Sequence, residues 1–213
     1  MFGPFLRVSH EGITVVLSPF SRDDMPVAAK GLSSLEVTMY TNQLFGQTLE
    51  SEQQWYDKQN SSSDSVIWRI SLEGEDTPIG TTGLHGITHP AHTCTSGIII
   101  WDRSKWGKGV ASRAHLARTL FAADFLDRYT IRSSVRTDNL ASLRALEKVG
   151  YTRTGMDPKS GFRAGKFLDT HILSWFNPAR VHLLYPEGVP EEYQVGLRRA
   201  EAALALGREV VTY

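Results

Sequence analysis

The chain contains 213 residues, of which 41% are hydrophobic and 22% are charged, and its 23 Lys and Arg residues balance 23 Asp and Glu residues. A chain of this length and composition can bury a core of its own, while a formal net charge of zero excludes the overall basic field that holds nucleic acid or an anionic membrane. The single cysteine, Cys94, excludes an internal disulfide and a cysteine-rich metal site, so we expect it to pack inside a strand.

The first hundred residues predict helices followed by an antiparallel meander of strands. Ser21 is placed to cap the first helix and Gly31 to end it, and polar turns at 73–78 and 89–92 separate the later strands. The run from Gly97 to Trp101 is apolar throughout, which favours a strand buried on both faces. The predicted elements are a strand at 13–17, helices at 21–30 and 48–58, and strands at 66–72, 79–88 and 93–101.

The second half predicts helices between strands, followed by an unusual tail. Gly150 suits the position that closes a helix, and a turn-rich loop is expected at 161–165. The predicted elements are helices at 110–127 and 139–149, strands at 129–135, 151–154 and 167–175, and a helix at 191–208. We expect a domain at 1–176 and an extension at 177–213, whose amphipathic helix packs on its own domain or forms a homodimer contact.

A glycine-rich loop leads from the apolar strand into the long helix, with the sequence Trp106-Gly-Lys-Gly-Val-Ala111. Gly107 and Gly109 let the backbone approach an anion closely, and the first helical turn offers free amides at the positive end of the helix dipole. The segment has neither the P-loop pattern nor the third glycine of the dinucleotide fingerprint. It therefore predicts an anion cradle, and the alternative is an ordinary turn before a helix. Nearby positive charge comes from Lys105, Lys108 and Arg113.

Together with downstream segments, this loop resembles the GNAT superfamily of acetyl-CoA-dependent N-acetyltransferases, and most of all its ribosomal-protein N-terminal acetyltransferase branch. The matching segments are Trp106–Ala111, Asn139–Ser142, Leu146–Tyr151 and Thr48–Trp55, together with Asp169. The resemblance covers roughly residues 10–176. It implies an α+β fold with a mostly antiparallel twisted sheet of about seven strands, flanked by helices, with a splayed central pair of strands and a C-terminal helical extension. It also implies acetyl-CoA as the cofactor, CoA as the product and no metal.

The resemblance also assigns the cofactor site residue by residue. The backbone of three strand residues would pair with the pantetheine arm: Ile99, Ile100 and Trp101. The amides of the loop and helix start would hold the pyrophosphate: Trp106, Gly107, Lys108, Gly109, Val110 and Ala111. Asn139 would bond the pantetheine arm. Many members place a tyrosine acid where this chain has Leu146, so the leaving thiolate would instead take its proton from Ser142, whose alternative role is to bond the backbone at a helix start.

The general base is not identified by the sequence, and four side chains are candidates for it. They are His85 on the strand before the apolar one, Asp169 and His171 on a late strand, and Glu52 on the helix that commonly covers the acceptor in this family. A structural role is the alternative for each. His85, His89 and His92 have a spacing that would suit a metal site on a helix, but Pro90 and the strand context argue against one.

The acceptor is expected to be a primary amine, with a protein N-terminus favoured over a small antibiotic or polyamine. Four acidic residues leave an acidic approach for a polycation open: Glu50, Glu52, Asp57 and Asp64. A non-catalytic acyl-CoA-binding module is the alternative of another class. No apolar run approaches the roughly 20 residues that cross a bilayer, and the N-terminal segment lacks the apolar core of a secretory signal. We therefore expect a cytoplasmic protein with neither a membrane nor a nucleic-acid partner.

Overall fold

The structure is a computed structural model that describes residues 1–41 and 45–213. Its helices are α1 (Met25–Leu32), α2 (Leu35–Thr38), α3 (Leu49–Ser61), α4 (Val110–Asp124), α5 (Leu140–Lys148), α6 (Val181–Leu184) and α7 (Glu191–Val210), with 3-10 turns at Arg22–Asp24 and Arg103–Lys105. Its strands are β1 (Leu6–His10), β2 (Ile13–Ser18), β3 (Ser65–Leu72), β4 (Gly80–His85), β5 (Thr93–Ile100), β6 (Thr130–Arg136), β7 (Thr152–Arg163), β8 (Lys166–Phe176) and β9 (Val211–Thr212).

Within the described residues, nine strands form one sheet in the order β7-β8-β6-β5-β4-β3-β2-β1-β9. Neighbours in this sheet run antiparallel except β5 and β6, which are parallel. The expected α+β fold with a mostly antiparallel sheet is therefore confirmed. The sheet is wider than the expected seven strands because β1 and the two-residue β9, which were not predicted, extend it on one side. β9 is too short to give a periodic pattern, whereas the sequence of β1 does alternate and was an available signal.

The hairpin of β7 and β8 is longer than predicted. We expected a loop at 161–165, but Phe162 pairs with Phe167 and the turn shrinks to Ala164 and Gly165, whose φ angles are +48° and +79°. Successive left-handed residues match the twist of a tight hairpin. The loop prediction was wrong because glycines in a strand can mark bulges, and this hairpin has register shifts before Gly161.

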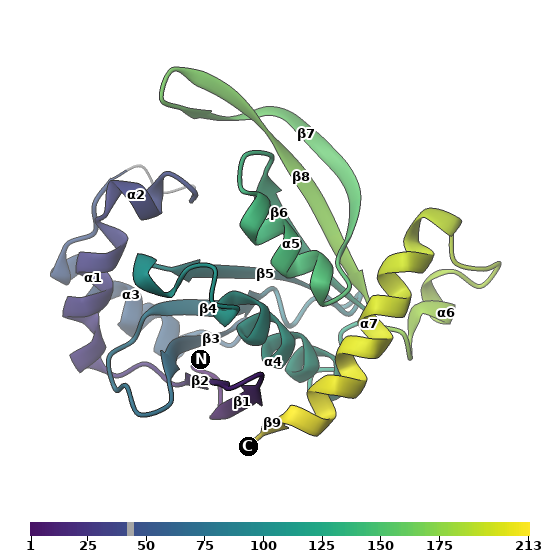
Figure 1. Cartoon of the computed structure of the whole chain (residues 1–213), viewed down its shortest axis with the longest axis horizontal. Helices are drawn as coiled ribbons and strands as arrows, with labels where there is room; N and C mark the ends of the chain where they lie inside the picture. Colours follow the sequence, from purple (N-terminus) through teal and green to yellow (C-terminus); the bar gives the residue numbers. More distant parts are fainter. Residues whose placement is uncertain (42–44) are drawn as a thin grey trace.

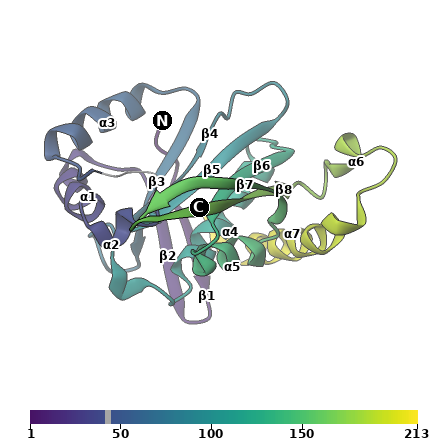
Figure 2. The same ribbon diagram turned by 90° about the horizontal axis from the view of Figure 1, so that it is seen from above.

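Two cores lie on the two faces of the sheet, because successive side chains of a strand point to opposite sides. Along β3, Trp68 belongs to the larger core, which also contains buried side chains of α4 and α7. The neighbouring Ile67 belongs to a smaller core with residues of α1 and with Trp55 of α3. Figure 2 shows α4, α5 and α7 together along one side of the sheet and α1 and α3 together away from them.

The expected splayed pair is present in the centre of the sheet. β5 and β6 pair in parallel only from Thr93 to Thr95, opposite Thr130 to Arg132. Beyond that point β5 stays paired with β4 as far as Ile100, while β6 continues to Arg136 beside β8. Figure 1 shows β6, β7 and β8 turning away from β5. The divergence opens an edge of β5 that has no strand partner among the described residues.

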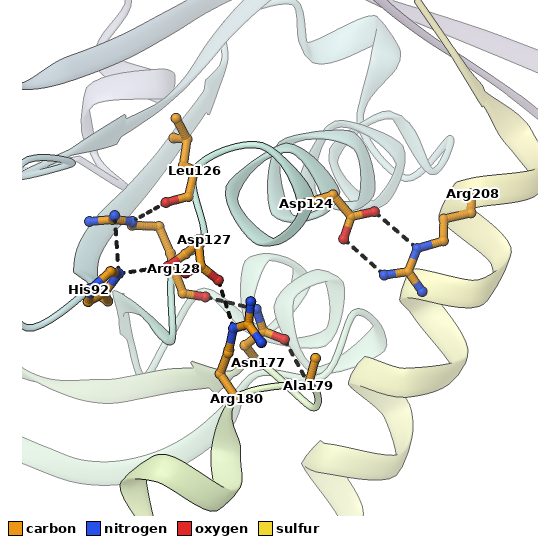
Figure 3. Close-up of polar contacts among 9 residues, drawn as sticks. All are labelled: His92, Asp124, Leu126, Asp127, Arg128, Asn177, Ala179, Arg180 and Arg208. Carbon is orange, nitrogen blue, oxygen red and sulfur yellow. Dashed lines mark hydrogen bonds and ion pairs between the residues drawn. The ribbon is translucent and has the colours of Figure 1, made fainter.

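The tail beyond residue 176 packs on the rest of the chain. Ala200 and Leu204 of α7 are buried in the larger core, and β9 pairs with β1. Arg208 of α7 makes a bidentate ion pair with Asp124 at the end of α4, at 2.9 and 3.0 Å, as Figure 3 shows. Of the two roles expected for the helix, the structure therefore shows packing on its own domain, and a homodimer stays a prediction. No helix among the described residues combines the length and apolar content needed to cross a bilayer.

Gly150→Ala is expected to destabilise the fold by bringing the α5–β7 turn too close to α7. Gly150 has φ +100°, and a Cβ there would lie 2.5 Å from the Ala200 amide nitrogen. Backbone strain costs about 1–3 kcal/mol, and overpacking adds about 1–3 kcal/mol. Urea unfolding measures the combined loss in the free energy of unfolding. Gly188→Ala is the matched control, because Gly188 has φ +113° with no atom within 4 Å of an added Cβ. Equal losses in the two variants would contradict the packing argument.

Candidate active site

A cleft of about 660 Å³ opens where β5 leaves β6. Its walls come from the end of β5, the glycine loop, the first turns of α4 and α5, and the segment that includes α2. Among its lining residues, Tyr40 packs edge-on against Trp106 with ring centroids 5.9 Å apart. The Arg136 guanidinium lies 5.6 Å from the centroid of the Tyr40 ring. The tip of the β7–β8 hairpin reaches the same segment, where Arg163 donates to the carbonyl of Thr41 at 2.9 Å.

The glycine loop presents backbone to this cleft. Gly107 and Gly109 have φ angles of +71° and +75°, and α4 begins at Val110. The Arg113 amide bonds the Gly109 carbonyl at 3.2 Å, so the amides that precede it in the first helical turn have no intrahelical acceptor. The Trp106 amide, in contrast, donates to the Arg103 carbonyl at 3.0 Å. The free amides therefore lie between residues 107 and 112.

The charges around the loop differ from those expected. Lys105 lines the cleft as expected, but its ammonium forms an ion pair with Glu75 at 2.8 Å. Arg113 is buried, does not line the cleft, and donates to the carbonyls of His10 at 2.6 Å and Gly109 at 3.2 Å. Two basic side chains that we did not predict, Arg144 and Lys148, line the cleft from one face of α5. Their spacing of four residues, which places them on one face of the helix that follows Asn139, was the available signal.

On the cleft side of β5, the backbone groups that remain unpaired are those of Ile98. Ser133 Oγ donates to the Ser96 carbonyl at 3.3 Å, and Trp106 Nε1 donates to the Ile100 carbonyl at 2.9 Å, both from the cleft side. Backbone groups alternate along a strand, so the N–H and C=O of Ile98 face the cleft between them. By the same alternation, the backbone groups of the predicted Ile99 point toward β4, as the Trp101 amide does when it donates to the Ile79 carbonyl.

Trp101 is also placed differently from the prediction, because its amide donates at 3.0 Å to the carbonyl of Ile79, the residue before β4. The side chains of residues 98–100 are half-buried, so this strand is not buried on both faces as expected. The reason is that one edge and parts of both faces of β5 border cavities.

Asn139 and Ser142 stand at the start of α5 and both line the cleft. Asn139 is the N-cap, and its Oδ1 accepts the Ser142 amide at 3.2 Å, which leaves its Nδ2 group as a donor. The Ser142 hydroxyl makes no hydrogen bond to the residues that the structure describes, so its alternative role of bonding the backbone is not observed. Leu146, one turn further, is buried in the core.

A second cavity of about 220 Å³ adjoins the first, and the two share Ile98 and Ile99 as lining residues. Its walls are mainly apolar and come from α1, α3 and strands β3 to β5: Phe20, Ala28, Leu32, Trp55, Ile67 and Trp101. Glu52 and His85 also line it. Glu52 is 5% exposed and is the one carboxylate among the described lining residues.

The two titratable groups of this cavity are shifted in ways that suit a base. Burial raises the pKa of Glu52, whose carboxylate has no hydrogen-bond or ion-pair partner among the described residues. Burial and the nearby charge of Arg118 lower the pKa of His85 from 6.5, which keeps its imidazole neutral at pH 7. A carboxylate with a raised pKa is a stronger proton acceptor than a free one.

The remaining candidates lie outside both cavities. Asp169 Oδ1 accepts the Lys159 amide at 2.8 Å in the β7–β8 hairpin, and neither Asp169 nor His171 lines either cavity. His92 Nδ1 shares a hydrogen bond with the Asp127 carbonyl at 3.0 Å (Figure 3). Throughout the described ranges, no three His, Cys, Asp or Glu side chains converge to hold a metal. Cys94 is buried as expected, and burial raises the pKa of its thiol to about 11.

Comparison with known proteins agrees with this geometry. A family model described as an acetyltransferase (GNAT) domain matches residues 14–152, which include β5, the glycine loop, α4 and α5. The probable N-acetyltransferase YjcK of Bacillus subtilis (strain 168) is 28% identical over 124 residues, covering 58% of this chain and 68% of that protein.

Two solved structures share the fold. Spermidine N-acetyltransferase from Vibrio cholerae, in complex with CoA and spermine, aligns with a TM-score of 0.70 and 18% identity, covering 76% of this chain and 95% of that chain. Mycobacterium smegmatis RimJ, in complex with CoA-disulfide, aligns with a TM-score of 0.69 and 19% identity, covering 99% of this chain and 95% of that chain. The RimJ alignment therefore extends over the C-terminal tail of this chain.

Proposed function

Because the chain belongs to the GNAT superfamily of acetyl-CoA-dependent N-acetyltransferases, we propose that it acetylates the N-terminal amine of a protein or peptide. CoA occupies the β5–β6 cleft and the amine enters the second cavity. The observation that carries this proposal is the shared wall, since Ile98 and Ile99 line both cavities. A donor in one cavity and an acceptor in the other meet at that wall, as direct transfer requires.

The residues of the cleft suit the cofactor. The amides between Gly107 and Ala111, at the positive end of α4, suit the pyrophosphate. Arg144 and Lys148, which have no ion-pair partner among the described residues, supply positive charge for a further phosphate. The free C=O of Ile98 suits an amide N–H of the pantetheine arm in the manner of an added strand, which leaves the Ile98 N–H for the acyl carbonyl. Bound there, acetyl-CoA supplies an activated acyl group.

The second cavity favours an N-terminal amine over a polyamine. A polycation is best held by several carboxylates, but Asp57 is paired with Arg22, and Asp64 accepts hydrogen bonds from Thr88. Glu52 is left as a single buried carboxylate among apolar walls. An α-amine has a pKa of about 8, against about 10.4 for a lysine-type amine. Glu52 as the single base therefore suffices to deprotonate an α-amine at neutral pH.

Three groups of this chain act on the reacting atoms in the proposed mechanism. Glu52 accepts the proton of the incoming ammonium, so that the neutral amine can form its bond to the carbonyl carbon. The Ile98 N–H donates to the carbonyl oxygen as negative charge develops there. As the carbon–sulfur bond breaks, the Ser142 hydroxyl donates a proton to the sulfur, the amide nitrogen loses its second proton to solvent, and Ser142 regains a proton from solvent. His85, whose pKa is lowered by burial and by the charge of Arg118, lines the same cavity as Glu52.

A thiol-release assay tests the function. Purified protein is mixed with acetyl-CoA and, in separate reactions, with peptides bearing a free α-amine and blocked lysines, with the same peptides blocked at the N-terminus, and with spermidine. We expect CoA to be released only in the reactions that contain peptides with a free α-amine. Mass spectrometry should then show an acetyl group on the N-terminus of those peptides. Turnover of spermidine without turnover of any peptide would refute the proposed acceptor and favour a small-molecule acetyltransferase.

Ser142→Ala is expected to lower kcat by about 10- to 100-fold while the Kd for CoA stays unchanged. This range is near the lower limit for a positioned proton donor, because a thiolate with a pKa of about 8.5 leaves readily by itself. Steady-state kinetics and calorimetric titration with CoA check the two halves of the prediction. Ser112→Ala is the control, because Ser112 lines the same cleft from α4. A fully active Ser142→Ala variant would exclude Ser142 as the acid.

A further inference from the structure

A buried arginine lies in the middle of α4. Arg118 is 0% exposed, and no carboxylate within residues 1–41 and 45–213 forms an ion pair with it. An unpaired buried charge destabilises a fold unless hydrogen bonds offset its loss of hydration. The guanidinium also leaves its Nε without an acceptor. An apolar side chain would pack at this position without the cost of burying a charge, so packing alone does not account for an arginine here.

The guanidinium of Arg118 joins three parts of the sheet. Its Nη1 donates to Thr82 Oγ1 of β4 at 2.8 Å and to the Gly97 carbonyl of β5 at 3.0 Å. Its Nη2 donates to the hydroxyl of Tyr151, just before β7, at 3.3 Å. Tyr151 is itself buried at 1% exposure. A single side chain thus ties β5 to its neighbour β4 and to the start of the hairpin on the far side of the splay.

The network continues to the point where β5 leaves β6. The Tyr151 hydroxyl is 3.0 Å from Ser96 Oγ, which in turn donates to the Arg132 carbonyl of β6 at 3.3 Å. From the other side, Ser133 Oγ donates to the Ser96 carbonyl at 3.3 Å. The last ladder pair of the two strands is Thr95 with Arg132. Side-chain bonds therefore replace the backbone ladder where the strands diverge.

We propose that Arg118 is a positioning residue for acetyl transfer, which sets the divergence of β5 from β6 and thereby aims the Ile98 N–H at the acyl carbonyl. Ile98 directly follows Gly97, whose carbonyl Arg118 holds. The inference rests on the cofactor site proposed above. It also explains why the charge sits on α4. The helix α4 begins at Val110, beside the proposed pyrophosphate site, and Arg118 follows eight residues later, about 12 Å along the helix axis. The single helix α4 thus sets the distance between the proposed pyrophosphate site and the part of β5 that faces the acyl group.

The test compares acetyl-CoA with S-ethyl-CoA, which has the same length but no carbonyl oxygen. Both are titrated without an amine, and kcat is measured separately. In Arg118→Met we expect kcat to fall about 10- to 100-fold, as for a misplaced reacting group. The preference for acetyl-CoA over S-ethyl-CoA should disappear, whereas the Kd for free CoA should change less than about threefold. Arg118→Lys, which keeps the charge, should recover part of kcat and part of the preference.

Thr119→Val is the matched control, because Thr119 is buried on the same helix and its hydroxyl has no partner among the described residues. It should leave kcat and the carbonyl preference unchanged. If Arg118→Met does not fold, Tyr151→Phe carries the test, since it removes one link of the network and should reduce both readouts. Wild-type kcat and wild-type carbonyl preference in a folded Arg118→Met or in Tyr151→Phe would overturn the proposal.

Failure of the proposed function gives a different result. If the wild-type protein acetylates no N-terminal amine but binds acetyl-CoA, the acceptor assignment fails. The carbonyl preference of the variants still decides the role of Arg118 in that case. If the wild-type protein binds acetyl-CoA and S-ethyl-CoA equally, the placement of the carbonyl against Ile98 fails, and the positioning role fails with it.

Discussion

Gly107→Glu should lower the affinity for CoA by about 100- to 1000-fold, because it places a carboxylate in the cradle proposed for the pyrophosphate. Two like charges about 4 Å apart repel by about 4 kcal/mol at an effective dielectric constant of 20. The added side chain has room, since a Cβ at Gly107 would have no other atom within 4 Å. Calorimetric titration with CoA measures the loss. Gly109 is less suitable, because a Cβ there would lie 2.3 Å from Arg113 Nη1.

The control for this variant is Gly12→Glu in the turn between β1 and β2. Gly12 has φ +74°, close to the +71° of Gly107, and an added Cβ there also has no atom within 4 Å. Both variants therefore carry the same new charge and a similar backbone strain of about 1–2 kcal/mol. Gly12 lines neither cavity. We expect CoA binding to survive in Gly12→Glu, and equal binding in the two variants would place the pyrophosphate elsewhere.

Glu52→Gln should lower kcat/KM for the amine by about 100- to 10,000-fold and leave CoA affinity unchanged. The amide is nearly isosteric with the carboxylate but cannot take the proton from an ammonium, and a positioned base contributes about this factor. Glu50→Gln is the matched control, because Glu50 is exposed two residues away on the same helix. Steady-state kinetics should show wild-type turnover for the control. Wild-type turnover in Glu52→Gln would remove Glu52 from the mechanism.

The same variant should be more stable than the wild type at neutral pH. Burial raises the pKa of Glu52 above its ordinary value of 4.5, so the folded protein holds this proton more tightly than the unfolded chain. Stability from that group is complete below pH 4.5 and is lost as the pH rises through the folded pKa. Glu52→Gln removes this loss. Melting temperatures at pH 4 and pH 7 should show a gain for the variant at pH 7 only.

Much of the cofactor site could be predicted because its signals are local. Gly107 and Gly109 adopt the left-handed conformation that glycine allows, directly before a helix start. Asn139 caps α5 as its residue type favours. Ser142 follows within one turn, so both necessarily share the first turn of α5. Short-range geometry decides such features, and a sequence contains all of it.

The residues of the proposed acceptor cavity could not be predicted from local sequence in this way. Glu52 was one of four candidate bases, and nothing in α3 itself distinguishes it from the exposed Glu50. It became the buried carboxylate because α3 packs against α1 over β3 and β5. Asp169 looked equally suitable but bonds the amide of Lys159 within the hairpin. Burial depends on which elements meet, and elements distant in sequence meet only in the folded chain.

The sequence by itself determined the fold family, the anion-binding loop and the turn that carries Asn139 and Ser142, because each depends on residues close together along the chain. Only the tertiary structure decided that Ile98 rather than Ile99 offers the open backbone edge. A shift of one residue in strand register turns every backbone and side-chain group to the other side, and the register of β5 is set by β4. The tertiary structure likewise placed Arg118 beneath the splay, where residues from the three strands β4, β5 and β6 and the turn at Tyr151 form one network.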